Sequence, residues 1–356
     1  MLKKMAIKGV VSGVVLTIAA SQAWAAATLS STGTVTINGN SVAVVVVTAD
    51  GVPYYGTSGA AGFEGANYLH TPSSQSYTFK IPSSPALAGS ATAGVYTPVV
   101  LAGDFGVASD GIPFDPLTSR CNGVAGSANN TCSWRVEGLL QSSPGTTTSQ
   151  YTTGRLGFDS HDGHVMSSGA YHYHGIPCNI VVASGNTKKK LLSCQPTIAN
   201  GWGNLPASAV TVGYARDGYP VVVKSGVYAS YSVATAAGTG RPSNTAYATL
   251  GNFAKDMSTL VASGATTFTM PSSKSFGDFT YTGPTSGYGT TAKLGLCNEA
   301  ANTDTAIKTI TGATAAYAYY LTPNFPMIPR CLIGVTENTS STANQQGFFH
   351  AGSGDD

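Results

Sequence analysis

The sequence is poor in charge. Only 10% of its 356 residues are Asp, Glu, Lys or Arg, against about 25% in an average globular protein. Its 18 basic residues slightly outnumber the 16 acidic ones, but three of the lysines lie within the first eight residues. Without that segment the formal net charge is −1. Charge therefore gives no argument for nucleic acid or an anionic membrane surface as a partner.

Several chemical signatures are also missing. The sequence has no Gly-x-Ser-x-Gly nucleophile motif, no phosphate-binding loop and no dinucleotide fingerprint. It has no Cys-x-x-Cys pair, which argues against a thiolate metal site. Helical patterning is scarce as well, and only residues 250–261 and 299–309 hint at helices. These absences disfavour nucleophilic hydrolases, nucleotide-binding enzymes and helical folds.

The N-terminus has the features of a targeting segment. Lysines precede an apolar stretch at 9–20, and Ala23-Trp24-Ala25 fits the small-x-small cleavage pattern. The apolar stretch is shorter than the roughly 20 residues that span a bilayer. We therefore expect residues 1–25 to be a signal peptide, with export to the periplasm or the extracellular space and no membrane span after cleavage. The alternative is an uncleaved N-terminal anchor.

All six cysteines lie after the expected cleavage site. An even number of cysteines in an exported chain indicates disulfides, although six of them allow 15 connectivities. Pairing each cysteine with its neighbour in the sequence gives the simplest prediction: Cys121–Cys132, Cys178–Cys194 and Cys297–Cys331.

Short β-branched segments dominate the rest of the chain. Residues 34–51 form two alternating stretches around Asn38-Gly39, which is a strong hairpin signal. Residues 178–194 resemble a second hairpin, with a cysteine at each end of its base. The sequence predicts an all-β fold, with one antiparallel β-sandwich-like domain at 26–337, long loops and few short helices. Within it 225–290 resembles an insertion, and 338–356 is expected to be a flexible tail.

An Asp-Gly-x-Pro pattern occurs three times, at 50–53, 110–113 and 217–220. Asp-Gly favours a turn, and the proline then begins a new strand, where its missing N–H costs least. Asp50 fits an ordinary turn. For Asp110 and Asp217 two interpretations stay open: ordinary turns, or turns that bring carboxylates to a shared site.

Histidines are concentrated in one place. Of the six, His161, His164, His172 and His174 fall within one short stretch. In a strand, alternate side chains share a face, so His172 and His174 would point to one side, and Tyr171 and Tyr173 to the other. His161 and His164 precede this strand in a Gly/Ser-rich segment that can fold back onto it.

This pattern suits a metal site. Histidines without thiolates favour Cu(II) or Zn(II), whereas a mixed histidine and aspartate set would also suit Fe(II) or Mn(II). Asp159 and Asp162 offer oxygen ligands or acceptors that orient an imidazole. The alternative is that the histidines are structural and bond to backbone or tyrosine in a polar core. His70 and His350 are isolated and are expected to be structural.

The same stretch resembles the YHYH domain family, which is named for Tyr-His-Tyr-His. Residues 156–178 match its core, with Asp159, His164, Gly169 and 171–174 at the matching positions. Weaker resemblance extends over 44–335, at the segments 103–116, 132–140, 213–222 and 316–334. In the last of these, residues 317–320 (Tyr-Ala-Tyr-Tyr) look like a second copy of the motif without its histidines. The resemblance implies an exported domain and locates the site, but it implies no particular reaction.

Two functional hypotheses follow. The first is an exported metal-binding domain with His161, His164, His172 and His174 as the ligand set. Asp159, Asp217 and Asp110 would lie around the ligands, and Tyr171 and Tyr173 would line a cleft or pack the core. The metal would be copper or zinc, and an open coordination position would allow hydrolysis or oxidation. The second is a non-catalytic extracellular domain in which the same strand is a core element.

Overall fold

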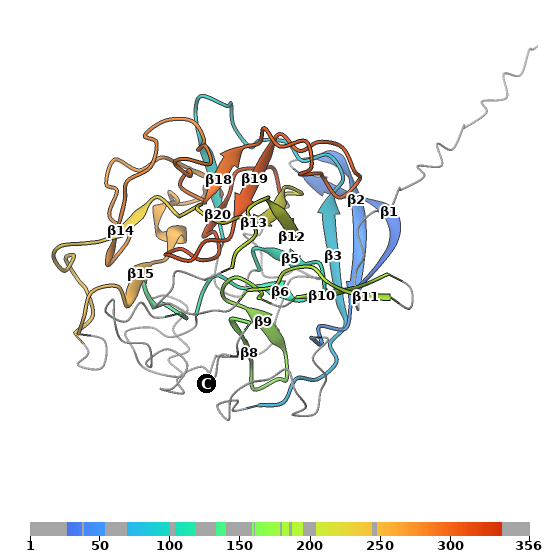
Figure 1. Ribbon diagram of the computed structural model, residues 1–356. Coiled ribbons are helices and arrows are strands. Elements are labelled where there is room, and N and C mark those ends of the chain that lie inside the picture. Colours follow the sequence, from blue (N-terminus) through green and yellow to red (C-terminus); the bar gives the residue numbers. More distant parts are fainter. Residues whose placement is uncertain are drawn as a thin grey trace, which may run out of the picture.

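The computed structural model describes residues 27–37, 39–53, 70–99, 104–118, 133–139, 159, 161–178, 180–184, 187–194, 204–243 and 248–336. The expected signal peptide, the Cys121–Cys132 pair and the C-terminal tail lie outside these residues. Within them the regular structure consists of strands and one short 3-10 helix, Met257–Leu260, as Figure 1 shows. The all-β prediction is therefore confirmed.

The sequence hints of helix are not borne out. Residues 250–261 contain strand β15 (Phe253–Lys255) and the 3-10 helix. The prediction of a helix at 299–309 is wrong, because this segment begins with strand β18 (Glu299–Ala301). This strand pairs with β19 (Tyr317–Tyr320). In both places strand pairing outweighs local helix propensity.

One large sheet carries the centre of the fold. Its strands are β5 (Gly106–Ala108), β6 (Pro113–Phe114), β8 (Gly163–Val165), β9 (Tyr171–Tyr173), β12 (Val210–Ala215), β13 (Pro220–Val223), β18 (Glu299–Ala301) and β19 (Tyr317–Tyr320). They lie in the order β18-β19-β13-β12-β5-β6-β9-β8. The pairs β6–β9 and β13–β19 are parallel and the others are antiparallel. The sheet is thus mixed, unlike the purely antiparallel sheets that the sequence predicts.

Smaller sheets surround it. They are formed by β1 (Ala27–Ile37), β2 (Asn40–Ala49) and β3 (Tyr77–Pro82); by β16 (Phe268–Thr269), β4 (Val95–Pro98) and β20 (Cys331–Leu332); by β7 (Trp134–Val136) and β15; by β14 (Tyr231–Val233) and β17 (Phe279–Tyr281); and by β10 (Val181–Ser184) and β11 (Thr187–Lys190). The Asn38-Gly39 hairpin prediction is confirmed, since Ile37 pairs with Asn40 and Gly39 has φ 78°.

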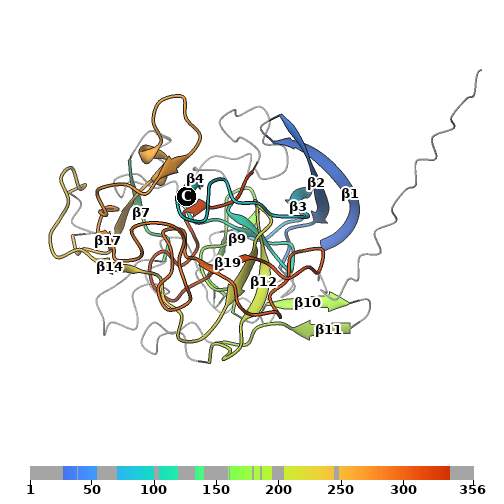
Figure 2. The same ribbon diagram turned by 90° about the horizontal axis from the view of Figure 1, so that it is seen from above.

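Two of the three predicted disulfides are present. Cys178–Cys194 closes the base of the β10–β11 ribbon, which projects from the body of the molecule in Figure 2. Cys297–Cys331 ties the loop before β18 to β20.

The segment 225–290, which the sequence suggested was an insertion, contributes to the main hydrophobic core. Its residues Tyr231, Phe276 and Phe279 are buried in this core, and the Phe279 ring stacks on Phe325 with ring centroids 3.6 Å apart. Among the described residues no helix is long and apolar enough to cross a membrane.

Candidate metal centre

The β8–β9 hairpin brings three histidines together at one end of the large sheet. His164 lies directly opposite His172 in the antiparallel register, so both side chains lie on the same face. His174 follows two residues later and shares that face. The turn between the strands uses Gly169 at φ 82°, whose N–H donates to the carbonyl oxygen of Met166 at 2.8 Å. A glycine suits this position because it adopts positive φ without strain.

The three imidazole rings form a compact, buried group. Their centroids lie 4.4 Å (His164–His172), 4.7 Å (His172–His174) and 5.0 Å (His164–His174) apart. The Nε2 atoms of His172 and His174 are 2.9 Å apart. One nitrogen from each ring falls within 4.8 Å of the other two. In the part of the chain that the structure describes, this is the only such group of three or more metal-ligating side chains.

The backbone of Asp162 fixes the third histidine. Asp162 adopts φ 58°, and its carbonyl oxygen accepts the N–H of His174 at 2.7 Å. Gly138 lies against the same ring, since a Cβ at this position would be 3.2 Å from His174 Nδ1. Both contacts restrict where the His174 ring can lie.

An acidic residue that the sequence interpretation missed completes the surroundings. Asp115 Oδ2 lies 4.0 Å from His172 Nε2. Asp115 follows β6, the parallel neighbour of β9, and its N–H donates to the carbonyl oxygen of Tyr173 at 2.9 Å. Its side chain is 12% exposed, whereas that of His172 is fully buried. The only sequence signal was its position two residues after the Asp-Gly-x-Pro proline.

His161 lies outside the three-histidine group. Its Nδ1 hydrogen bonds to the carbonyl oxygen of Cys178, and its N–H donates to Asp159 Oδ1 at 2.8 Å. Its ring therefore interacts with backbone beside the Cys178–Cys194 disulfide.

Four of the other predicted site residues, Tyr171, Tyr173, Asp159 and Asp110, meet on the opposite face of β9, where both tyrosines are fully buried. The Tyr171 hydroxyl donates to Asp159 Oδ2 at 2.6 Å, and the Tyr173 hydroxyl donates to Asp110 Oδ2 at 2.7 Å. These two hydrogen bonds hold β9 in place on the face opposite the histidines.

Asp217 makes the same contact far from the histidines, where it accepts the Tyr319 hydroxyl at 2.5 Å. Burial raises the pKa of Asp110 to about 7 and that of Asp217 to about 6. Asp217 accepts an additional N–H, from Gly334 at 2.8 Å, which offsets more of the burial effect. Asp110 and Asp217 thus pair with tyrosines of different strands, Tyr173 of β9 and Tyr319 of β19.

Fold and site together define an all-β protein with a buried three-histidine group at the end of a mixed sheet. The family model described as YHYH protein matches residues 78–334. Because this match covers well over half of the chain, the protein belongs to the YHYH protein family, as the resemblance implied. No curated protein and no solved structure matches it.

Proposed function

We propose that this chain is an exported metal-binding protein in which His164, His172 and His174 hold one transition-metal ion. The convergence of three buried ring nitrogens within 4.8 Å carries the proposal. Three imidazoles are one of the protein ligand sets of catalytic zinc sites, which keep a fourth position for water or substrate.

The ligand chemistry favours copper or zinc. Imidazole nitrogen suits both, and intrinsic affinity ranks copper higher. Asp115, whose Oδ2 lies 4.0 Å from His172 Nε2, would supply an oxygen ligand or a proton acceptor beside the metal. Zinc there would support hydrolysis by a bound hydroxide, and copper would support oxidation. Either chemistry would make this protein a metal-dependent enzyme.

Export is supported by two disulfides, Cys178–Cys194 and Cys297–Cys331. Such bonds persist in oxidising compartments and are rare in a reducing cytosol. They agree with the signal peptide expected at 1–25 and with a periplasmic or extracellular location.

Metal content tests the proposal. The mature chain is purified without a His tag, equilibrated with copper or zinc, desalted and measured by elemental mass spectrometry. We expect about one ion per chain, retained by His70→Ala and lost from His172→Ala/His174→Ala. His70 is the matched control because it is a histidine outside the group. A folded wild-type chain that retains neither metal contradicts the proposal and favours the non-catalytic structural role.

A further inference from the structure

We infer that the large sheet consists of two copies of one four-stranded unit, and that the second copy contains a silent counterpart of the three-histidine site. The first unit is β5, β6, β8 and β9, and the second is β12, β13, β18 and β19. Ala300, Ala318 and Tyr320 occupy the positions of His164, His172 and His174. The inference rests on the proposed function only for what the first site binds.

The strand order is the first support. From the centre outward, the first unit is β5-β6-β9-β8 and the second is β12-β13-β19-β18. Each contains an antiparallel hairpin, a parallel junction and a second antiparallel hairpin, in that order. The β8–β9 and β18–β19 hairpins lie at opposite ends of the sheet in Figure 1.

The central pair of strands shows the symmetry relation. In the β5–β12 register Gly106 faces Ala215 and Ala108 faces Gly213, on either side of the pair Val107–Tyr214. Exchanging the two strands reproduces the same pairs of residue types. A pseudo-twofold axis therefore passes between β5 and β12.

The turns fix the equivalence of the units. Asp110-Gly111-Ile112-Pro113 and Asp217-Gly218-Tyr219-Pro220 have glycine φ angles of 86° and 89°. The first aspartate accepts the hydroxyl of Tyr173, and the second accepts that of Tyr319.

The parallel junctions agree with this assignment, since Phe114 pairs with Tyr173 and Val221 pairs with Tyr319. Tyr173 thus corresponds to Tyr319, and Asp115 corresponds to Val222.

The outer hairpins extend the match to the ligand positions. His164 faces His172 in the first unit, and Ala300 faces Ala318 in the second. The carbonyl oxygen of Asp162, at φ 58°, accepts the N–H of His174. That of Asn298, at φ 53°, accepts the N–H of Tyr320 at 2.9 Å.

The loop carries its carboxylate at different positions in the two units. In the first unit Asp159 accepts the N–H of His161 at 2.8 Å, and residue 163 is glycine. In the second unit residue 295 is glycine, and Glu299, at the position of Gly163, accepts the N–H of Cys297 at 2.8 Å. A Cβ at Gly295 would collide with the Glu299 carboxylate. The two carboxylates thus fill equivalent space from opposite sides of the loop.

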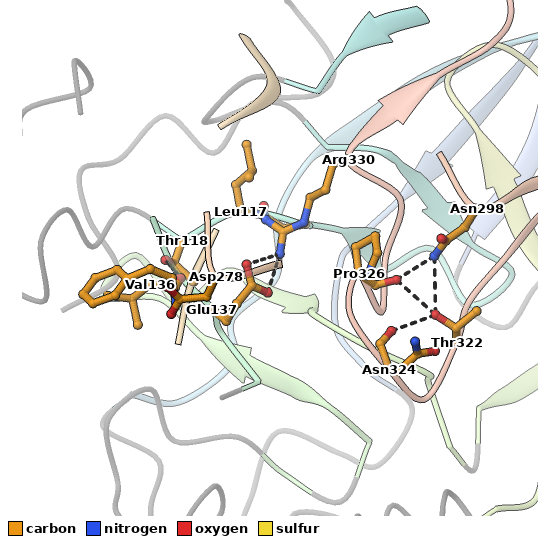
Figure 3. Close-up of polar contacts among 12 residues, drawn as sticks. Leu117, Thr118, Val136, Glu137, Asp278, Asn298, Thr322, Asn324, Pro326 and Arg330 are labelled. Carbon is orange, nitrogen blue, oxygen red and sulfur yellow. Dashed lines mark hydrogen bonds and ion pairs between the residues drawn. The ribbon is translucent and has the colours of Figure 1, made fainter. Parts of the chain in front are cut away.

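Apolar side chains fill the silent position. Val222, Ala300, Ala318 and Tyr320 belong to one buried hydrophobic cluster, with Leu294 and Ile307 among its other members. The loop is anchored separately by Asn298, whose Nδ2 donates to the carbonyl oxygen of Pro326 at 2.6 Å, as Figure 3 shows. The second unit therefore has the same backbone arrangement as the first, with buried apolar side chains in place of the histidines.

Grafting the ligands tests the inference. The variant Ala300→His/Ala318→His/Tyr320→His/Val222→Asp is made in the full chain and equilibrated with copper or zinc. We expect about two ions per chain, against about one in wild type. Adding His172→Ala/His174→Ala to the graft returns the content to about one ion, held in the second unit. The control Ala300→Asn/Ala318→Asn/Tyr320→Asn is expected to gain none. A folded graft that gains no metal, while wild type holds its ion, overturns the inference.

The reverse exchange needs no metal and therefore separates this inference from the proposed function. It places second-unit residues in the first unit: His164→Ala/His172→Ala/His174→Tyr/Asp115→Val. Measured in a chelator, this chain should melt at a higher temperature than His164→Ala/His172→Ala/His174→Ala/Asp115→Val, because only it fills the space with the second unit's tyrosine. If the chain with His174→Tyr melts at the same or a lower temperature than the chain with His174→Ala, then His174 and Tyr320 are not equivalent. This test remains decisive even if the grafted variant fails to fold.

Discussion

The β8–β9 and β18–β19 hairpins share a backbone frame and differ in what they bury. Both use a positive-φ residue to hold the strand end and a tyrosine that donates to a buried aspartate. One encloses three histidines, and the other encloses alanines and a tyrosine. The frame therefore forms in the second unit without histidines, and both units have a buried Tyr–Asp pair. The histidines are thus not needed to build this backbone frame, which agrees with the metal-binding role proposed above.

The two units also differ in how their loops are fastened. His161 hydrogen bonds to the Cys178 carbonyl in the first unit, whereas Cys297 forms a disulfide with Cys331 at the corresponding point of the second. A hydrogen bond can open locally, and a covalent bond cannot. The two loops are thus held differently, the first by a hydrogen bond beside the Cys178–Cys194 disulfide and the second by the Cys297–Cys331 disulfide itself.

The largest expected effect comes from removing the covalent fastening. Cys297→Ala/Cys331→Ala opens a loop of sequence separation 34 and should cost roughly 4 kcal/mol of unfolding free energy by the loop-entropy relation. His161→Ala should cost less, about 1–3 kcal/mol, because it takes a hydrogen bond away from the buried carbonyl oxygen of Cys178. Urea unfolding of both variants in a chelator measures the two costs. Equal costs would contradict the difference in fastening.

Metal should stabilise one unit only. At about 100 times its dissociation constant a bound ion adds about 2.7 kcal/mol to the stability of the folded state. Hydrogen exchange followed by mass spectrometry should therefore slow around 163–173 on metal addition, and change little around 299–320. His172→Ala/His174→Ala is the control and should show no slowing. An equal slowing of hydrogen exchange at both hairpins would mean that metal also binds the second unit. This would contradict the inference that the second unit has lost its metal site.

Removing a tyrosine hydroxyl should destabilise both units, and in the second unit it also removes the acceptor of the Ile333 N–H, which lies 2.6 Å from the Tyr319 hydroxyl. Tyr173→Phe and Tyr319→Phe each leave a buried carboxylate with one acceptor bond fewer, which costs about 1–3 kcal/mol. Urea unfolding of the two variants compares the costs, and elemental analysis checks that Tyr319→Phe keeps its metal. A loss from Tyr173→Phe alone would mean that this tyrosine serves the metal centre rather than the frame.

Much of this arrangement could be predicted from local pattern. Strand alternation places His172 and His174 on one face and the tyrosines on the other, and the structure agrees. Two neighbour disulfides are confirmed because each closes a local loop. The Asp-Gly-x-Pro turns form as predicted, with the Ile112 N–H donating to Asp110 Oδ1 at 3.2 Å.

What escaped prediction depends on strands that are distant in sequence. Asp115 reaches His172 only because β6 pairs in parallel with β9, and no local pattern specifies that pairing. The tyrosine partners of Asp110 and Asp217 come from parallel neighbours for the same reason. The second motif copy at 317–320 is visible in the sequence, but its place at the far end of the sheet follows from the strand order.

The smallest expected effect concerns pH. The pKa of Asp110 in the folded state, about 7, lies further above the ordinary aspartate pKa of 3.8 than the pKa of Asp217, about 6. A carboxyl whose pKa is raised by folding stabilises the folded state fully below its unfolded pKa, and this contribution is lost as the pH rises to the folded pKa.

The loss therefore falls between about pH 4 and 7 for Asp110, and between about pH 4 and 6 for Asp217. Asn has the shape of the neutral acid and does not titrate. The free energy of unfolding of Asp110→Asn, relative to wild type, should rise from pH 4 to 8 by about 1.4 kcal/mol more than that of Asp217→Asn. Urea titrations of the three chains at each pH, in a chelator, measure this. Histidine titration is common to all three and cancels in the differences. If the unfolding free energies of the two Asn variants, each relative to wild type, rose equally with pH, the additional N–H of Gly334 would not make the two buried carboxyls differ.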